Sequence, residues 1–424
     1  MLREKARFST EAEAPGAFPM KIALVCDWFS PRIGGMERHL AELAKHLAAA
    51  RHDVTVITPT PGPAAATSGY RIHRLKVTLL PIVHLMWTPA GFRRLGQAIR
   101  GGNFDVVHVH ASIISPAAFA ALYVAQQAGL PTVTTGHSIS GGFTRLFQWI
   151  DRQVRWTQWN VAFSTVSERV AREVRPLVAP HQVDVLPNAI DPAEWHLAPQ
   201  LPRDGIVIAC VMRLARRKRG VALLRAFHHV RTQLPGGFRV QLHIAGEGPE
   251  RARWERLSRR LGLTDSVRFL GACTVEDVKA LLASSDFFVL ASKLEAFGIA
   301  ALEARAAGLP VVAMREGGVG EFIADGKEGL LAADDHQLAQ QMLRLCIDAS
   351  LRNRIATHNR RTPVVFTWPH TLAAHLATYA RARALCPDHR PFPMRKHAPA
   401  ATPVTGPLHS IEAAVSIRNT DSVH

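Results

Sequence analysis

The sequence KIALVCDWFSPRIGGMERHLAELAKHLAAARHDVTVIT, residues 21–58, decides the fold. Residues 21–27 form a short apolar run typical of a buried strand, and the segment 36–50 places Leu40, Leu43 and Leu47 on one helical face. A second apolar run, residues 52–58, follows at once. This order predicts two parallel strands, because a crossover helix returns the chain to the same end of the sheet.

The same pattern recurs along the chain. In the first half it gives strands at 104–110 and 131–138 with a helix at 120–129 between them. After a stretch at 186–205 that is rich in proline and polar residues, five more strand candidates follow, at 206–213, 239–248, 266–271, 286–292 and 310–314. The sequence therefore predicts an α/β protein with two doubly wound, Rossmann-like domains facing across a cleft, in which ligands bind beyond the carboxyl ends of the strands.

The composition shifts along the chain predict its division into domains. We expect a flexible N-terminal extension at 1–19, a first domain at 20–190, a linker at 191–204, a second domain at 205–362, a C-terminal helix at 363–385 that packs back on the first domain, and a disordered tail at 386–424. Both Met1 and Met20 remain open as the true start. Residues 1–20 lack the apolar core of a signal peptide, and no apolar run is long enough to span a bilayer. The predicted location is the cytoplasm, with a peripheral position at the inner face of the cytoplasmic membrane as one form of it.

The charge balance predicts an anionic partner. The 424 residues include 51 Lys and Arg against 34 Asp and Glu, a formal charge of +17. Nucleic acid, an anionic membrane surface, a phosphorylated ligand and plain compositional drift all fit this excess. Segments 77–100 and 141–160 combine aromatic and arginine side chains, which is typical of a membrane-interface segment or of an ordinary core-facing helix. The five cysteines form no CxxC pair, which favours reduced thiols over a zinc or disulfide framework.

Two loops after predicted strands carry candidate anion-binding residues. Gly34 and Gly35 stand between a strand and a helix, where glycine lets the backbone approach a ligand, although a plain tight turn fits them equally. In the second half, Arg213 and Lys218 stand five positions apart in a loop that enters a helix. Such a pair is able to hold a diphosphate from two sides, and solvated surface charge is the alternative.

Two glutamates and one histidine complete the candidate site. Glu295 ends a strand, residues 296–298 form a turn and Glu303 lies in the next helix. The two glutamates can then bracket a polyhydroxylated ligand whose phosphates meet the amides of Phe297, Gly298 and Ile299. Carboxylates accept hydrogen bonds from sugar hydroxyls, and surface decoration is the alternative. His137 ends a first-domain strand and is a catalytic candidate. His108 and His110 alternate on one strand and are interpreted as structural, and the sequence assembles no metal site.

From residue 21 to about residue 382 the chain resembles the retaining GT-B glycosyltransferases of family four. The resemblance rests on segments that are specific in combination, namely VLPNAIDP at 185–192, RLARRK at 213–218, AGEGPERARWERL at 245–257, EAFGIAALE at 295–303 and GGVGEFIADGKEGLL at 317–331. Within the family the chain is most similar to the transferases that place N-acetylglucosamine on phosphatidylinositol, and more loosely to bacterial phosphatidylinositol mannosyltransferases. Gly320 stands where the family usually has proline, and Arg219 interrupts a common lysine–glycine pair.

The resemblance implies a role for each candidate residue. Arg213 and Lys218 would grip the diphosphate of a nucleotide sugar, helped by the Gly34–Gly35 loop. Glu295 would bind hydroxyls of the donor sugar, with the amides of Phe297, Gly298 and Ile299 beside it, and Glu303 would hold the ribose. His137 would lie near the donor sugar and support the reacting centre.

The implied function is metal-independent, retaining transfer of N-acetylglucosamine or a hexose from a UDP- or GDP-linked donor. The implied acceptor is a lipid or glycolipid, which suits the basic aromatic segments, and no nucleic-acid partner and no cofactor are expected. A sugar-nucleotide epimerase of the same fold and a non-catalytic basic binding protein are the two alternatives. The sequence leaves the oligomeric state open.

Overall fold

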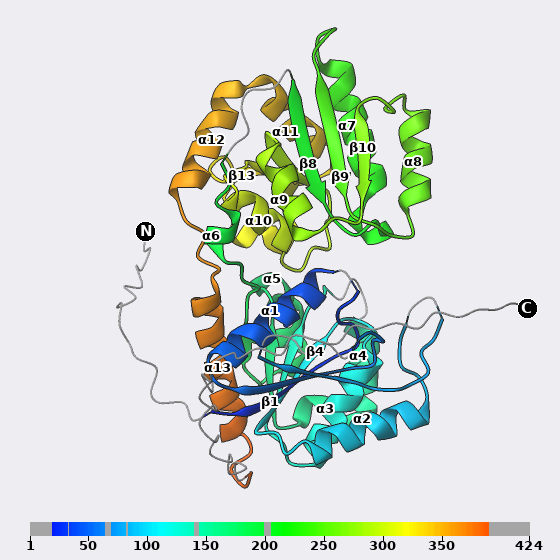
Figure 1. Ribbon diagram of the computed structural model, residues 1–424, viewed down its shortest axis with the longest axis vertical. Coiled ribbons are helices and arrows are strands. Elements are labelled where there is room, and N and C mark those ends of the chain that lie inside the picture. The colour runs from blue at the N-terminus through cyan, green and yellow to red at the C-terminus, as the bar shows by residue number, and fades with distance from the viewer. Residues whose placement is uncertain are drawn as a thin grey trace, which may run out of the picture. The chain divides into compact units, whose positions relative to one another are not determined.

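The computed structural model describes residues 19–32, 34–63, 69–81, 84–139, 144–198 and 205–389. The expected extension, up to residue 18, and the expected tail, beyond residue 389, lie outside the described residues. Two parallel sheets with helices on both faces make up the described chain (Figure 1). The predicted class, α/β with two doubly wound Rossmann-like domains, is confirmed.

The first sheet has seven strands in the order β3-β2-β1-β4-β5-β6-β7. Every neighbouring pair is parallel, as expected when helices make the crossovers. The strands are β1 (Lys21–Cys26), β2 (Asp53–Thr58), β3 (Arg71–Arg74), β4 (Val106–Ala111), β5 (Thr132–Gly136), β6 (Val161–Thr165) and β7 (Val183–Val185). The helices are α1 (Gly35–Ala49), α2 (Pro89–Gly101), α3 (Pro116–Gln127), α4 (Thr144–Val154) and α5 (Glu168–Val178), with the short helix η1 at Trp156–Gln158.

The second sheet has six parallel strands in the order β10-β9-β8-β11-β12-β13. They are β8 (Ile206–Val211), β9 (Val240–Ala245), β10 (Val267–Gly271), β11 (Phe287–Leu290), β12 (Val311–Met314) and β13 (Gly329–Ala332). The helices are α7 (Gly220–Gln233), α8 (Arg251–Arg260), α9 (Val275–Ala283), α10 (Ile299–Ala306), α11 (Asp335–Ile347) and α12 (Ala349–Arg361), with η2 at Arg216–Lys218 and η3 at Gly318–Glu321. The sequence analysis missed β13, whose apolar residues Gly329–Ala332 are too few to show a period.

The inner strands of the first sheet are buried on both faces, which explains the nearly unbroken apolar sequence of a strand such as β1. In β1, Ala23 and Val25 belong to one core cluster, whereas Ile22, Leu24 and Cys26 belong to the cluster on the opposite face. Successive side chains of a strand point to opposite faces, so a strand between two helix layers needs apolar residues at every position.

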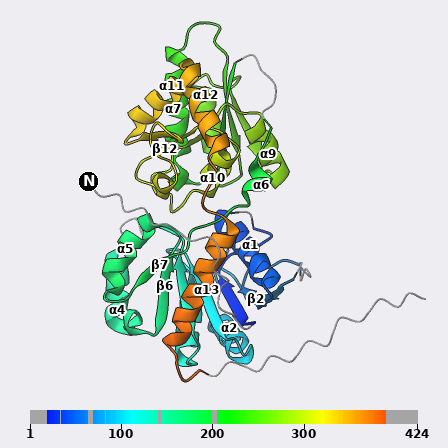
Figure 2. The same ribbon diagram turned by 90° about the vertical axis from the view of Figure 1, so that its left-hand side faces the viewer.

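Two helices lie outside the two predicted domains. The short helix α6 (Pro192–Trp195) falls in the segment predicted as a linker, and its Trp195 is buried in a core cluster of the second half. The last helix, α13 (Trp368–Ala384), lies along the first sheet (Figures 1 and 2). The Tyr379 hydroxyl lies 2.9 Å from Nδ1 of His108, and Arg381 pairs with Asp184 at 2.7 Å, so α13 closes one face of that sheet.

Candidate functional site

The loop that carries Arg213 is fixed by the loop after the next strand. The Leu214 amide donates to the Glu247 carbonyl at 2.9 Å, and the Glu250 amide donates to the Leu214 carbonyl at 3.0 Å. Gly248 has a φ of +159°, and a Cβ there would lie 2.3 Å from the Leu214 oxygen, so only glycine permits this approach. The exposed side chain of Arg213 therefore projects from a rigid backbone.

Lys218 and Glu295 meet although they are distant in the sequence. Lys218 ends η2, and its Nζ lies 2.6 Å from Oε2 of Glu295, which follows β11. The exposed fractions of the two side chains are 16% and 13%, so the pair is largely shielded from water. A diphosphate that approached Lys218 would be repelled by the Glu295 carboxylate unless that carboxylate turned toward donor groups such as sugar hydroxyls.

The turn between Glu295 and α10 depends on close backbone contact. Gly298 is the N-cap of α10 with a φ of +95°, and no side chain caps the helix. The Gly318 amide donates to the Glu295 carbonyl at 2.8 Å, and a Cβ on Gly318 would lie 2.2 Å from the Ala296 oxygen. The first-turn amides of α10 thus form an N-terminus that favours negative charge, beside the Lys218–Glu295 pair.

Glu303 is paired with a residue of the first half that sequence analysis missed. Its Oε1 accepts a hydrogen bond from Nη1 of Arg38 on α1 at 2.8 Å. Burial raises the pKa of Glu303 to about 7, and the positive charge of Arg38 opposes that rise. The Arg38 guanidinium also lies 5.3 Å from the Trp195 ring centroid. No pattern in the sequence distinguishes Arg38 from an ordinary surface arginine.

The Gly34–Gly35 loop lies at the start of α1 and reaches the second half. A Cβ on Gly35 would lie 3.7 Å from Cδ1 of Ile299, the first residue of α10. Nearby, Arg32 pairs with the buried Glu37 at 3.3 Å, and the charge of Arg213 acts on the pKa values of both groups. The loops after β1, β8 and β11 therefore come together.

His137 lies in a cluster of histidines on the first sheet. Its Nε2 lies 2.9 Å from Nδ1 of His110, and its ring centroid lies 6.4 Å from that of His39 on α1. Burial lowers the pKa of all three imidazoles, which favours their neutral forms at pH 7. His108 and His110 are both buried, and His110 in addition contacts the catalytic candidate His137. Within the described residues, no hydrogen bond joins His137 to Lys218 or Glu295.

Helix α1 connects these groups. Gly35 approaches α10, Arg38 binds Glu303, and His39 approaches His137. Arrangements of three or more His, Cys, Asp or Glu that suit a metal ion do not occur among the described residues. Likewise, within the described ranges no helix combines the length and apolarity needed to cross a bilayer.

Comparison of the chain with protein-family models and known proteins identifies its family. Residues 33–194 match the model of Glycosyltransferase Family 4, and residues 192–362 match that of Glycosyl transferases group 1. Glycogen synthase of Mycobacterium tuberculosis is 31% identical over 86% of this chain and 95% of that protein.

A second relative and a solved structure are also similar to the chain. One subunit of the human phosphatidylinositol N-acetylglucosaminyltransferase is 30% identical over 72% of this chain, and the match spans 64% of the human protein. HepE of Anabaena, solved with UDP and glucose, superposes with a TM-score of 0.66 at 18% identity over 84% of this chain and 98% of HepE. At 18% identity, the similarity to HepE shows only that the two proteins share a fold.

Proposed function

Because the chain belongs to the group 1 glycosyltransferases of the GT-B fold, we propose that it transfers a sugar from a nucleotide diphosphate donor to a lipid or glycolipid acceptor, with retention at the anomeric carbon. The sugar is N-acetylglucosamine or a hexose such as mannose or glucose. The observation that carries the proposal is the pair of contacts, Lys218 with Glu295 and Arg38 with Glu303, at the uncapped start of α10.

The donor is proposed to bind across α10. Lys218 and Arg213 would hold the diphosphate, since guanidinium and ammonium groups bind phosphate oxygens well. Glu295 would turn from Lys218 to hydroxyls of the sugar, and Glu303 would accept from the ribose hydroxyls. UDP is the first nucleotide to test, because HepE was solved with it.

The chemical step is proposed to rely on charge stabilisation of the leaving group. As the bond between the anomeric carbon and the phosphate oxygen breaks, Arg213, Lys218 and the α10 amides would stabilise the growing negative charge. With no carboxylate assigned as nucleophile, the acceptor hydroxyl would attack from the same face, and the leaving phosphate oxygen would take its proton. His137 would support the reacting centre from the first half.

Exposed aromatic side chains of the first half support a lipid acceptor. Trp149 on α4 is 58% exposed, and Phe119 on α3 lies 6.2 Å, ring centroid to centroid, from Phe147 of α4. Other large apolar side chains exposed in this region are Trp87, Ile114, Tyr123 and Val154, and exposed arginines near them are Arg93, Arg94, Arg145, Arg152 and Arg155. Aromatic side chains with arginines favour the interface of an anionic bilayer, so the acceptor is proposed to lie at the cytoplasmic face of a membrane.

Donor binding is tested by titrating the purified protein with UDP-N-acetylglucosamine, UDP-glucose and GDP-mannose. One donor is expected to bind, and Arg213→Ala to weaken it about tenfold or more, since a hydrogen bond to a charged group contributes about 1.5–3 kcal/mol. Arg231→Ala, an exposed substitution on α7, is the control. Binding that is equal in both variants would remove the assigned role of Arg213.

Transfer and membrane binding need separate measurements. With the bound donor and vesicles that contain phosphatidylinositol, NMR of the product is expected to show the anomeric configuration of the donor, and an inverted product would refute retention. Donor epimerisation without acceptor would instead favour the epimerase. Trp149→Ala combined with Phe119→Ala is expected to weaken vesicle binding about tenfold or more, because each loses apolar burial. Phe238→Ala, which removes an exposed aromatic ring from the second half, is the matched control.

A further inference from the structure

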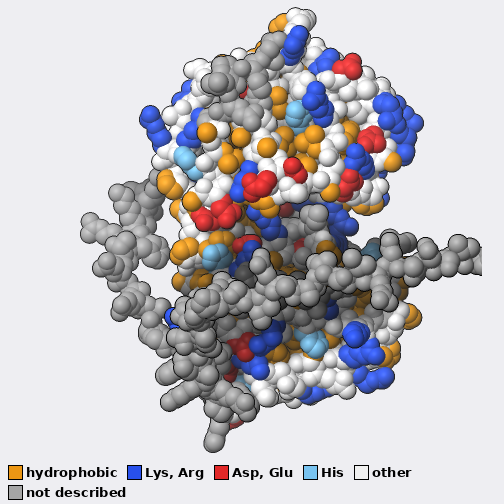
Figure 3. Space-filling view, viewed as in Figure 1, with side chains coloured by type: hydrophobic (Ala, Val, Ile, Leu, Met, Phe, Trp, Pro, Cys, Tyr) orange, Lys and Arg blue, Asp and Glu red, His pale blue; other side chains and the backbone are white. Residues whose placement is uncertain are grey.

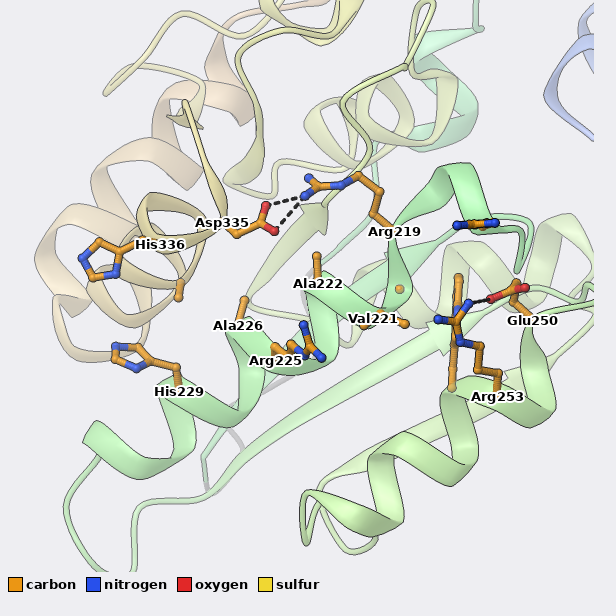
Figure 4. Close-up of a pocket in the computed structure, with 14 residues that line it drawn as sticks. Arg219, Val221, Ala222, Arg225, Ala226, His229, Glu250, Arg253, Asp335 and His336 are labelled. Atoms are coloured by element: carbon orange, nitrogen blue, oxygen red, sulfur yellow. Dashed lines mark hydrogen bonds and ion pairs between the residues drawn. The ribbon is translucent and has the colours of Figure 1, made fainter. Parts of the chain in front are cut away.

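A groove on the second half lies between α7, α8 and α11 (Figure 4). It encloses a cavity of about 540 Å³. Its apolar lining consists of Val221, Ala222, Ala226, Ala339 and the ring of Trp254, which packs so closely under α7 that a Cβ on Gly220 would lie 2.4 Å from the indole. Small side chains on a rigid floor leave the cavity open.

Basic side chains surround this floor. Arg225 lies between His229 and His336 at one end and Arg253 at the other in Figure 4. Arg216 and Arg219 complete the set, and Lys and Arg side chains also gather over α8 on the face shown in Figure 3. The groove is therefore a basic pocket and not an apolar one.

The arginines exceed the carboxylates that could neutralise them. Asp335 binds Arg219 with both oxygens, at 2.6 and 2.7 Å, and Glu250 binds Arg253 at 3.0 Å. The lining holds four arginines and two carboxylates, so two positive charges are left over before either histidine is counted. Within the described residues, Arg216 and Arg225 form no ion pair.

This groove is separate from the proposed donor site. At the junction of η2 and α7, Lys218 extends to Glu295, whereas the next residue, Arg219, extends to Asp335 and to the Ala291 carbonyl at 3.1 Å. No residue proposed to touch the donor lines the cavity: Arg213, Lys218, Glu295 and Glu303 are all absent from its walls.

We propose that the groove between α7, α8 and α11 is a second anion site, which binds the phosphate group of a small phosphorylated molecule. Arg216 and Arg225 provide guanidinium groups with unused donors, which bind phosphate oxygens two at a time. Arg253 lies in reach from the opposite wall, and the small apolar floor accommodates the body of a compact ester. The dipole of α7, which starts here, adds positive potential.

The site is tested with inorganic phosphate as the probe, by calorimetry in the presence of saturating UDP, which occupies the proposed donor site. Phosphate is expected to bind the unmodified protein, and Arg225→Ala and Arg253→Ala are each expected to weaken it about tenfold or more. Arg256→Ala, on the exposed side of α8 and outside the cavity, is expected to bind phosphate normally. Absence of phosphate binding, or equal binding by all four proteins, would overturn the proposal.

Two further arms separate the sources of phosphate and the two proposed sites. The Arg225→Ala variant and the unmodified protein are expected to bind vesicles that contain phosphatidic acid equally well. If Arg225→Ala instead loses vesicle binding but still binds inorganic phosphate, a small soluble ligand would be refuted. UDP binding is expected to survive Arg225→Ala and to be weakened by Arg213→Ala. If UDP fails to bind at all, the phosphate titration is carried out without it, so the donor proposal can fail while the groove proposal stands.

Discussion

Arg38 and Glu303 lie 265 positions apart in the sequence, yet their side chains form a hydrogen-bonded ion pair of 2.8 Å. The Glu303 carboxylate is almost completely buried, with 4% of its side chain exposed, whereas 37% of the Arg38 side chain is exposed. A cation from α1 therefore opposes the rise in pKa that burial imposes on a carboxylate of α10. A ligand that bound at Glu303, as proposed, would therefore be coupled to the first half of the chain.

This pair predicts a pH-dependent donor affinity. Burial raises the pKa of Glu303 to about 7, so the carboxyl keeps its proton in mildly acidic solution and ionises as the pH rises through that value. Only the ionised form offers both oxygens as acceptors to ribose hydroxyls, so the affinity for a nucleotide sugar is expected to increase through about pH 7 and then to level off. UDP-glucose is a better probe than UDP for this measurement. Free UDP carries a terminal phosphate whose second pKa is about 6, so its own titration would overlap with that of Glu303, and UDP-glucose lacks this group.

Two variants check the assignment. Glu303→Gln is expected to bind UDP-glucose more weakly and without this pH dependence. Arg38→Met removes the charge that opposes the rise, so the midpoint is expected to move to higher pH. An unchanged midpoint in Arg38→Met would show that Glu303 does not govern the transition.

Substitution of Gly318 or Gly320 tests whether the turn before α10 depends on close backbone contact. In Gly318→Ala the new Cβ would lie 2.2 Å from the backbone oxygen of Ala296, so the turn that carries Glu295 must shift. We expect a loss of about 1–3 kcal/mol in the free energy of unfolding, measured in urea, together with weaker donor binding. Gly320→Ala is the matched control, because its Cβ meets nothing closer than the Arg315 oxygen at 3.8 Å. Equal stability of the two variants would contradict the prediction.

The sequence predicts the fold well because a strand buried on both faces needs apolar residues at nearly every position, and such runs are visible in the sequence. Strands such as β1 and β8 are nearly unbroken apolar runs, and helices such as α1 repeat leucine on one face. The strand β3, with alternating exposed and half-buried residues Arg71–Arg74, lies at the sheet edge and gives no comparable signal. Sequence analysis therefore misses short edge elements such as β3, and it also misses the interior strand β6, whose five residues include Ser164 and Thr165.

For the site, sequence analysis names residues but not their partners. Loop position and family motifs both point to Lys218 and Glu295, yet the ion pair between them depends on how β8 and β11 lie together in the sheet. The sequence does not indicate Arg38 and His110 as site residues, because only tertiary contacts with Glu303 and His137 distinguish them. The roles of these residues in catalysis stay predictions.

The cations of the donor site predict activity without a divalent metal. In the proposed donor site, Arg213 and Lys218 would supply positive charge where the leaving diphosphate develops its negative charge, so that task would not need a metal. Sugar transfer is expected to be unchanged by EDTA. Loss of activity in EDTA that magnesium restores would contradict this prediction. Lys218→Met is expected to lose most activity both with and without EDTA, which would show that the measured activity depends on the Lys218 ammonium group.

Asp27, which is not among the residues proposed to bind the donor, predicts an effect on stability. It follows β1, is almost fully buried, and its two oxygens accept from the amides of Ala117 and Ala118 at 2.9 and 3.2 Å, at the start of α3. Asp27→Ala leaves both amides without an acceptor, so the free energy of unfolding in urea at pH 7 is expected to fall by about 1–3 kcal/mol. Asp265→Ala, an exposed substitution, is expected to leave it unchanged.

The difference in stability between the unmodified protein and Asp27→Ala is expected to depend on pH, because the Asp27 carboxyl titrates. Burial raises the pKa of Asp27 from 3.8 to about 6, so the folded protein holds this proton more tightly than the unfolded chain does. The resulting stabilisation is fully present below pH 3.8 and is lost as the pH rises through about 6. The stability gap between the unmodified protein and Asp27→Ala is therefore expected to narrow between those pH values while remaining positive at pH 7. A gap that widens with pH would mean that hydrogen bonds to the ionised carboxylate outweigh its burial.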